Sequence, residues 1–205
     1  MSYSPLIEQL VHALCNLPGV GPKSAQRIAF NLLDKQPDKG MDLAHTLQKA
    51  LSQVAHCSYC RNFTESQICH ICQDTHRNPA SICVVETPAD LVAIEQTGTY
   101  KGYYFVLMGH LSPIDGIGPQ ELQLDLLQKR LQDNPEIKEL ILATGTTPEG
   151  EATAYYIAEL AQQHNLKVSR LAYGIPLGGE LEYIDHTTLH HAFSSRQDFQ
   201  NSKSD

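Results

Sequence analysis

The chain has 205 residues, 41% of them hydrophobic, and a formal net charge of −8. This length supports one large domain or two modest ones, and no apolar run is long enough to span a membrane. The charge is unevenly spread: residues 1–80 hold seven Lys or Arg against six Asp or Glu, whereas residues 81–205 hold eight against 17. We therefore expect a polyanionic partner to meet the N-terminal part of the chain.

The N-terminal part is predicted to form three helices. Ser4 and Pro5 are typical of a helix start, and the apolar spacing after them predicts a helix that ends before Pro18. A second helix is predicted at 23–33, and a third at 41–54. The buried side of the third helix is expected to consist of Leu43, Leu47, Ala50, Leu51 and Val54.

The segment between the first two helices reads Leu-Pro-Gly-Val-Gly-Pro. Gly19 and Gly21 can adopt positive φ and expose backbone N–H groups at the positive end of the next helix, where a phosphate oxygen is stabilised. Lys23 and Arg27 are four residues apart and share one helix face beside this turn. The alternative is a structural turn with two solvated cations, but the string LPGVGPKSA resembles the helix-hairpin-helix DNA-binding motif. We therefore predict sequence-independent phosphate binding by these four residues.

Four cysteines follow in the pattern C-x2-C-x8-C-x2-C. Two such pairs complete a tetrahedral zinc site that leaves no open position for substrate. The alternatives are two disulfides or free thiols, but the N-terminus lacks a signal-peptide pattern, and we expect a reducing cytoplasmic location. One structural zinc per chain is predicted, which supplies much of the folding energy of this short segment. Its ligands are Cys57, Cys60, Cys69 and Cys72.

Other residues near the cysteines have two interpretations each. His56, His70 and His76 could replace a ligand, although four cysteines complete the zinc site without them. Tyr59 and Phe63 could stack on nucleic-acid bases, but we expect them to pack against the zinc turns.

From Ser81 onwards, short apolar runs alternate with amphipathic stretches. This alternation is typical of a doubly wound, mostly parallel α/β sheet. The predicted strands are 81–85, 103–108, 140–143 and 167–172. One helix is predicted to open within Thr-Pro-Ala-Asp at 87–90, and two others to span 120–131 and 149–163. In such sheets, binding and catalytic residues collect at the carboxyl ends of the strands.

Two glutamates are predicted at that edge of the sheet, Glu86 after the first strand and Glu149 in the string ATGTTPEGEA after the third. The arrangement resembles the Toprim domain of topoisomerases and primases, in which an Asp-x-Asp pair holds magnesium. The matching positions here are Gly145 and Thr147, and neither offers a carboxylate. We therefore expect neither bound magnesium nor catalytic residues. The G-x-x-x-x-G-K-[ST] motif of ATPases is also absent from the sequence.

The C-terminal segment contains the string GGELEYID. Its residues 179–185 are expected to form an exposed strand, with Glu180, Glu182 and Asp185 facing water. The polar residues from Ser194 onwards are expected to form a mobile tail.

Taken in order, these segments resemble the RecR family of bacterial recombination mediator proteins. The resemblance rests on LPGVGPKSAQR, the paired CxxC units, ICVVE, YFVLMGHLSP, DGIGP, EGEATA and GGELE, and it covers about residues 5–188. It implies a helix-hairpin-helix domain at 1–54, a C4 zinc finger at 55–78, a Toprim domain at 79–175, and a Walker B-like segment with its tail at 176–205. One departure is Gly-Thr-Thr-Pro before EGEATA, where the family more often has Asn-Pro-Thr-Val.

The resemblance also implies a function, namely a non-enzymatic DNA-binding clamp in recombinational DNA repair, cytoplasmic and associated with the nucleoid. RecR-like proteins form rings, typically homotetramers, that can encircle DNA. They act with RecO, and in many bacteria RecF, to place RecA on single strands coated by SSB. Lys23 and Arg27 are then the DNA contacts inside the ring. Two alternatives remain open, a small magnesium-dependent Toprim nuclease or topoisomerase-like enzyme, and a zinc-stapled protein adaptor that does not bind DNA.

Overall fold

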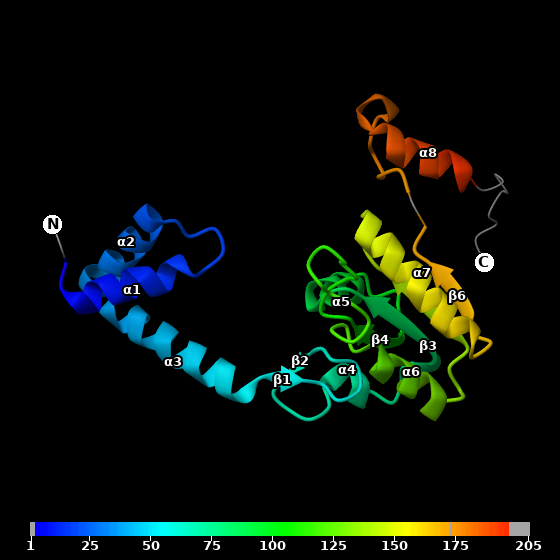
Figure 1. The fold of residues 1–205 in the computed structure, drawn as a ribbon, viewed down its shortest axis with the longest axis horizontal. Coiled ribbons are helices and arrows are strands. Elements are labelled where there is room, and N and C mark those ends of the chain that lie inside the picture. Colours follow the sequence, from blue (N-terminus) through cyan, green and yellow to red (C-terminus); the bar gives the residue numbers. More distant parts are fainter. Residues whose placement is uncertain (1–2, 173, 197–205) are drawn as a thin grey trace. The chain divides into compact units, whose positions relative to one another are not determined.

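The computed structural model describes residues 3–172 and 174–196 (Figure 1). The chain divides into two compact units, Met1–Ala55 and His56–Asp205. The first is helical. The second contains the cysteine segment, a parallel sheet with helices on both faces, and a C-terminal helix.

The first unit contains α1 (Pro5–Cys15), α2 (Pro22–Phe30), a π-helical turn (Asn31–Lys35) and α3 (Pro37–Gln53). Prolines open all three helices, where a missing N–H costs nothing. Ser4 stands at the N-cap of α1 as predicted, but its hydroxyl makes no capping hydrogen bond.

The apolar side of α3 is exposed, so the prediction that it is buried is wrong for the single chain. The helix also starts at Pro37, earlier than predicted, and it contains no buried residue. Leu43, Leu47 and Leu51 are 55%, 54% and 78% exposed. Their four-residue spacing places them on one side of the helix. Among the described residues of the first unit, the fully buried ones are Ala25 and Ala29 of α2.

The boundary between the two units falls after the first residue of the knuckle, the name used here for residues 55–78. The knuckle holds β1 (Ala55–His56), β2 (Phe63–Thr64) and α4 (His70–Gln73). Four parallel strands follow in the order β4-β3-β5-β6, which confirms the predicted parallel sheet. The strands are β3 (Asn78–Val85), β4 (Gly102–Val106), β5 (Glu139–Ala143) and β6 (Lys167–Arg170). The helices between and after them are α5 (Pro88–Gln96), α6 (Leu124–Asp133), α7 (Pro148–Gln162) and α8 (His186–Ser194).

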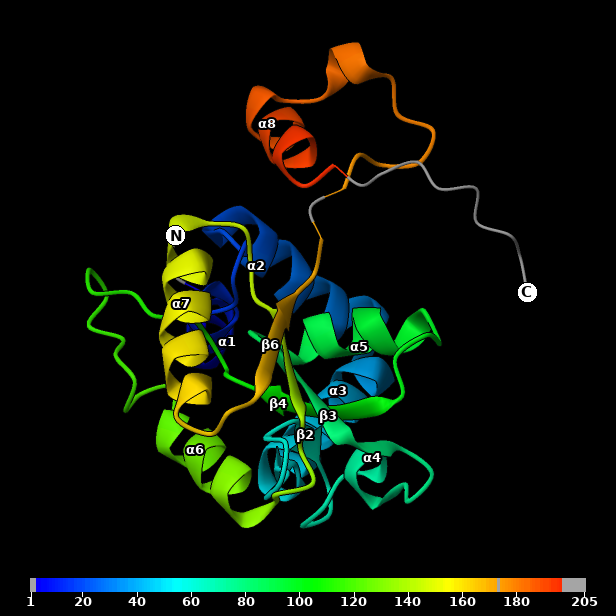
Figure 2. The same cartoon turned by 90° about the vertical axis from the view of Figure 1, so that its right-hand side faces the viewer.

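Each face of the sheet has its own hydrophobic core. Because side chains alternate along a strand, Ile82 and Val84 of β3 face the α6 and α7 side, whereas Cys83 and Val85 face the other. On that second side lie α5 and the knuckle (Figure 2). The knuckle therefore takes the place of a further helix in an ordinary doubly wound domain, since it keeps part of one sheet face out of water.

The C-terminal segment differs from its prediction. Leu181–Tyr183 form a 3-10 turn, not a strand, and Asp185 caps α8 by accepting a 2.9 Å hydrogen bond from the backbone N–H of Thr188. Leu181 and Tyr183 alternate with charged residues, which favours a strand. The structure instead has a helix that starts directly after Asp185, its N-cap. Most of the predicted mobile tail, residues 197–205, lies outside the described residues.

A partly buried cluster joins the end of the knuckle to α5. The guanidinium of Arg77 pairs with the carboxylate of Glu95, which also accepts a 2.6 Å hydrogen bond from the hydroxyl of Tyr104. Burial alone would raise the pKa of Glu95, but these hydrogen bonds and the charge of Arg77 outweigh it and lower that pKa below its usual value. The ionised carboxylate is therefore the form that stabilises the fold.

Replacing Glu95 with glutamine is expected to lower stability by about 1–3 kcal/mol at neutral pH, because Arg77 loses its charged partner. A lowered folded-state pKa means that this contribution is present above about pH 4.5 and is lost as the pH falls through the folded pKa. Urea unfolding of Glu95→Gln and wild type from pH 7 to 3 should give curves that converge in acid. The exposed Glu159→Gln serves as control, and a constant gap between Glu95→Gln and wild type would contradict the prediction.

Among the helices that the structure describes, every one is too short or too polar to cross a lipid bilayer.

Candidate zinc centre and nucleic-acid interface

The four cysteines of the knuckle converge on one point. Their Sγ atoms all lie within 4.8 Å of one another, and the Sγ atoms of Cys60 and Cys69 are 3.5 Å apart. A disulfide requires about 2.05 Å. Two sulfurs that each lie about 2.3 Å from a tetrahedral zinc are instead about 3.8 Å apart. The cluster therefore fits one structural zinc, as predicted, and none of the four cysteines forms a disulfide.

Arg61 shapes the first zinc turn and anchors it to the sheet domain. Its φ of 66° lies in the left-handed region, and its N–H donates to the carbonyl of Cys57 at 2.9 Å. One guanidinium nitrogen donates to the carbonyls of Leu107 and Leu122, at 3.1 and 2.6 Å. Burial lowers the pKa of this arginine, which is a cost of placing its charge here. The arginine is retained because both buried backbone carbonyls need a hydrogen-bond donor. The sequence does not reveal this role, because no sequence pattern marks an arginine that adopts a left-handed backbone conformation.

Tyr59 and Phe63 do not pack against the zinc turns, so that expectation is wrong. Their exposed fractions are 51% and 56%, and neither ring belongs to a core cluster. Phe63 instead stacks on the ring of His56, with centroids 5.1 Å apart. Cys57, Cys60 and Cys69 are buried against the sheet. The zinc turns therefore pack on the sheet rather than on these two rings.

The glycine turn between α1 and α2 has the positive φ considered in the sequence analysis at Gly19 but not at Gly21. Gly19 has a φ of 78°, which only glycine adopts without strain, and Gly21 stands at the N-cap of α2 with an extended backbone. No side chain caps this helix, so the N–H groups of Lys23 and Ser24 in its first turn have no intrahelical acceptor. An anion placed there would accept them.

Lys23 and Arg27 lie on one side of α2, beside a shallow pocket of about 460 Å³. The same pocket is lined by Lys35, which the sequence analysis did not single out, and by one acidic residue, Asp34. Lys35 follows Arg27 by eight residues, a spacing that continues the Lys23–Arg27 row along a helix. The π-helical turn keeps the chain helical through Lys35 and so brings this third cation beside the other two.

Glu86 reaches the loop between β5 and α7, but its carboxylate is already engaged. One oxygen accepts a 2.7 Å hydrogen bond from the N–H of Gly145, and the other lies 3.2 Å from Nδ1 of His110. Glu149 is the second residue of α7, and within the described residues its carboxylate makes no hydrogen bond or ion pair. The two predicted acids therefore do not form a matched pair.

Arg170 adds a positive charge to the same edge of the sheet. It comes from the end of β6, pairs with the carboxylate of Glu151 at 2.5 Å and donates to the carbonyl of Gly145 at 3.1 Å. The sequence analysis missed both His110 and Arg170. The available signal was their position, since both follow or end strands whose carboxyl ends gather here.

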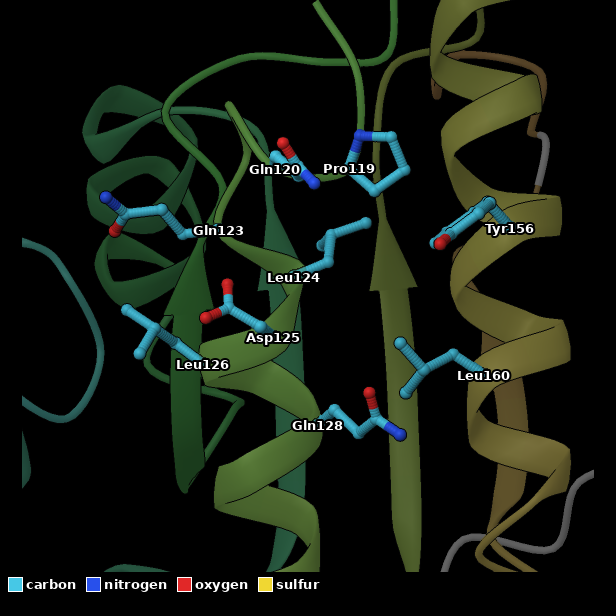
Figure 3. Close-up of a pocket in the computed structure, with 9 residues that line it drawn as sticks. All are labelled: Pro119, Gln120, Gln123, Leu124, Asp125, Leu126, Gln128, Tyr156 and Leu160. Atoms are coloured by element: carbon cyan, nitrogen blue, oxygen red, sulfur yellow. The ribbon is translucent and has the colours of Figure 1, made fainter.

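A groove of about 610 Å³ lies between α6 and α7 in the second unit (Figure 3). Gln120, Gln123, Gln128 and Asp125 line one side, and Tyr156 and Leu160 of α7 line the other. None of the cysteines, hairpin cations or Toprim-like glutamates contributes to this groove.

Models of four protein families match successive parts of the chain. Residues 7–51 match the model described as RecR, helix-hairpin-helix, and residues 54–74 match the RecR zinc finger domain with four cysteine ligands. Residues 80–172 match the Toprim domain, and residues 174–197 match RecR, C-terminal. The four matches stand in the order in which the helical unit, the cysteine cluster, the parallel sheet and α8 follow one another, and so this chain belongs to the RecR family.

Proposed function

We propose that this chain is a non-enzymatic, DNA-binding clamp in recombinational DNA repair, cytoplasmic and associated with the nucleoid. The observation that carries DNA binding is the uncapped N-terminus of α2, flanked by Lys23 and Arg27. Its first-turn N–H groups and the two cations attract a phosphate oxygen without contacting a base. Binding is therefore independent of sequence and weakens steeply with salt.

Assembly into a ring is supported by the exposed side of α3. Leu43, Leu47 and Leu51 form an apolar row that a stable helix normally buries. We propose that a second copy covers it. Several copies then turn their hairpins towards one DNA, which raises the number of phosphates that are met at once. A single N-terminal part with a net charge of +1 would bind DNA weakly.

The absence of catalysis is supported by the Toprim-like edge of the sheet. A divalent cation there needs several oxygen ligands. Glu86 is engaged by Gly145 and His110, and Glu151 is neutralised by Arg170. Gly145 and Thr147 offer no side-chain carboxylate. We propose that this edge serves recognition rather than hydrolysis, and that RecO-like and RecF-like proteins act with the ring to place RecA on SSB-coated single strands.

The test is charge reversal at the hairpin, Lys23→Glu together with Arg27→Glu. We expect affinity for DNA to fall by about 100-fold or more near physiological salt, with a shallower salt dependence, because two phosphate contacts per chain become repulsive. Fluorescence anisotropy with a labelled oligonucleotide across a salt series measures both quantities.

The matched control reverses two other exposed lysines, Lys49→Glu on α3, which lies off the row of Leu43, Leu47 and Leu51, together with Lys101→Glu before β4. This change has the same net charge and is expected to weaken binding far less. Zinc content and light-scattering mass should be unchanged in both double variants. Undiminished DNA affinity of the hairpin variant would contradict the proposal and favour a protein adaptor.

A further inference from the structure

Two aromatic rings of the knuckle, those of Tyr59 and Phe63, lie outside the hydrophobic core clusters. Tyr59 and Phe63 are each more than half exposed, and they are separated by only four positions. Exposed aromatic side chains are typical of contact surfaces, because leaving them in water forgoes hydrophobic stabilisation. The stacking of Phe63 on His56 leaves the opposite face of its ring for another planar group.

The backbone beneath Tyr59 is held rigidly. One guanidinium nitrogen of Arg130 donates to the carbonyls of Tyr59 and Tyr104, at 2.8 and 2.7 Å. The N–H of Ser58 donates to the carbonyl of Gln67 at 3.0 Å, and the zinc ligand Cys60 follows Tyr59 directly. A ring on a fixed backbone loses little conformational entropy when a ligand binds against it.

A small basic pocket of about 300 Å³ adjoins the ring of Tyr59. Its charged lining is Arg61, Lys129, Arg130 and Asp133, a formal charge of +2. This local sign is opposite to that of residues 81–205, which carry −9. Arg61 and Arg130 are committed to backbone carbonyls. The ammonium group of the exposed Lys129, by contrast, makes no hydrogen bond or ion pair with any described residue.

We propose that Tyr59, Phe63 and Lys129 form a second nucleic-acid contact, specific for single strands, in which the rings stack on unpaired bases and Lys129 meets a phosphate. Rings of this kind reach the faces of bases only where these are not already stacked in a duplex. An acidic peptide would satisfy Lys129 but would leave both rings without a partner. The contact extends the proposed DNA-binding function to another site and does not depend on the hairpin.

The test measures binding of a labelled oligo-dT and of an abasic oligonucleotide of equal length and charge to the full chain. Tyr59→Ala and Phe63→Ala are each expected to weaken oligo-dT binding roughly tenfold, because one stacked base is lost. They should leave the abasic strand almost unaffected, and Tyr59→Phe should restore binding. Lys129→Gln should weaken both strands equally. Tyr155→Ala, which removes an exposed ring from α7, is the matched control.

Each outcome separates this contact from the hairpin. In the Lys23→Glu, Arg27→Glu background, Tyr59→Ala should still reduce the remaining oligo-dT binding by the same factor. Stacking is refuted if Tyr59→Ala weakens the binding of oligo-dT and of the abasic strand by the same factor, or if it weakens neither. This conclusion holds whatever the effect of the hairpin substitutions. Polyglutamate serves as a probe for acidic peptides. If it binds wild type and Tyr59→Ala weakens that binding as much as it weakens oligo-dT binding, the surface is assigned to acidic peptides instead.

Discussion

Removal of zinc is expected to unfold the parallel sheet and not only the knuckle. Cys57, Cys60 and Cys69 belong to the same hydrophobic cluster as Val85 and Tyr104 of the sheet. The knuckle therefore covers one face of β3 and β4. Zinc binding contributes about 10–16 kcal/mol to small sites of this kind, whereas a whole domain is stable by about 5–15 kcal/mol. Losing the metal would remove a core layer that the sheet cannot replace.

The measurement is hydrogen exchange after chelation or in Cys57→Ser. The amide of Val106 is a direct reporter, because it donates to the carbonyl of Cys60 at 2.8 Å across the junction. We expect loss of about one zinc per chain, together with loss of protection at Val106 and along β3. Cys15→Ser, a cysteine of α1 outside the cluster, should keep both. A sheet that stays protected without zinc would show that the two parts fold independently.

The patterns that predicted the fold are those in which local chemistry leaves few choices. Paired CxxC units converge on a metal whatever surrounds them, and a short apolar run before a capped helix becomes a parallel strand. The helix after β3 illustrates this point, because Thr87 and Asp90 form a reciprocal capping box at its start. Boundaries shifted where turns intervened, as at Gln123, whose φ of 53° delays the start of α6.

What the sequence did not reveal depends on partners that are distant in the chain. The apolar row of α3 indicates that something covers it, but not whether the cover belongs to the same chain. Glu86 is the expected acid at the expected strand end, yet its occupation by Gly145 and His110 follows from tertiary packing. The exposure of Tyr59 likewise follows from tertiary packing, because the neighbouring cysteines Cys57 and Cys60 are buried while the ring between them is not.

Gly150→Ala is expected to be among the most destabilising single substitutions in the second unit. Gly150 is a buried residue in the first turn of α7, where alanine would ordinarily favour the helix by about 1 kcal/mol. A Cβ at this position would lie 2.3 Å from the carbonyl oxygen of Gly145 and 2.9 Å from Oε1 of Glu86. The closer neighbour is backbone, so the loop that holds Glu86 must move. We expect a net loss of about 3 kcal/mol or more.

Urea unfolding of the full chain measures this loss, and a second helical glycine provides the control. A Cβ at Gly40 in α3 would meet its nearest neighbour, the Cβ of Leu32, at 3.5 Å, which is ordinary contact. Gly40→Ala should therefore stabilise the first unit by about 0.5–1 kcal/mol. Truncating Glu86 should not rescue Gly150→Ala, because the carbonyl of Gly145 remains in the way. If Gly150→Ala unfolds at the wild-type urea concentration, the close approach of α7 to this loop, and with it the engaged state of Glu86, does not exist.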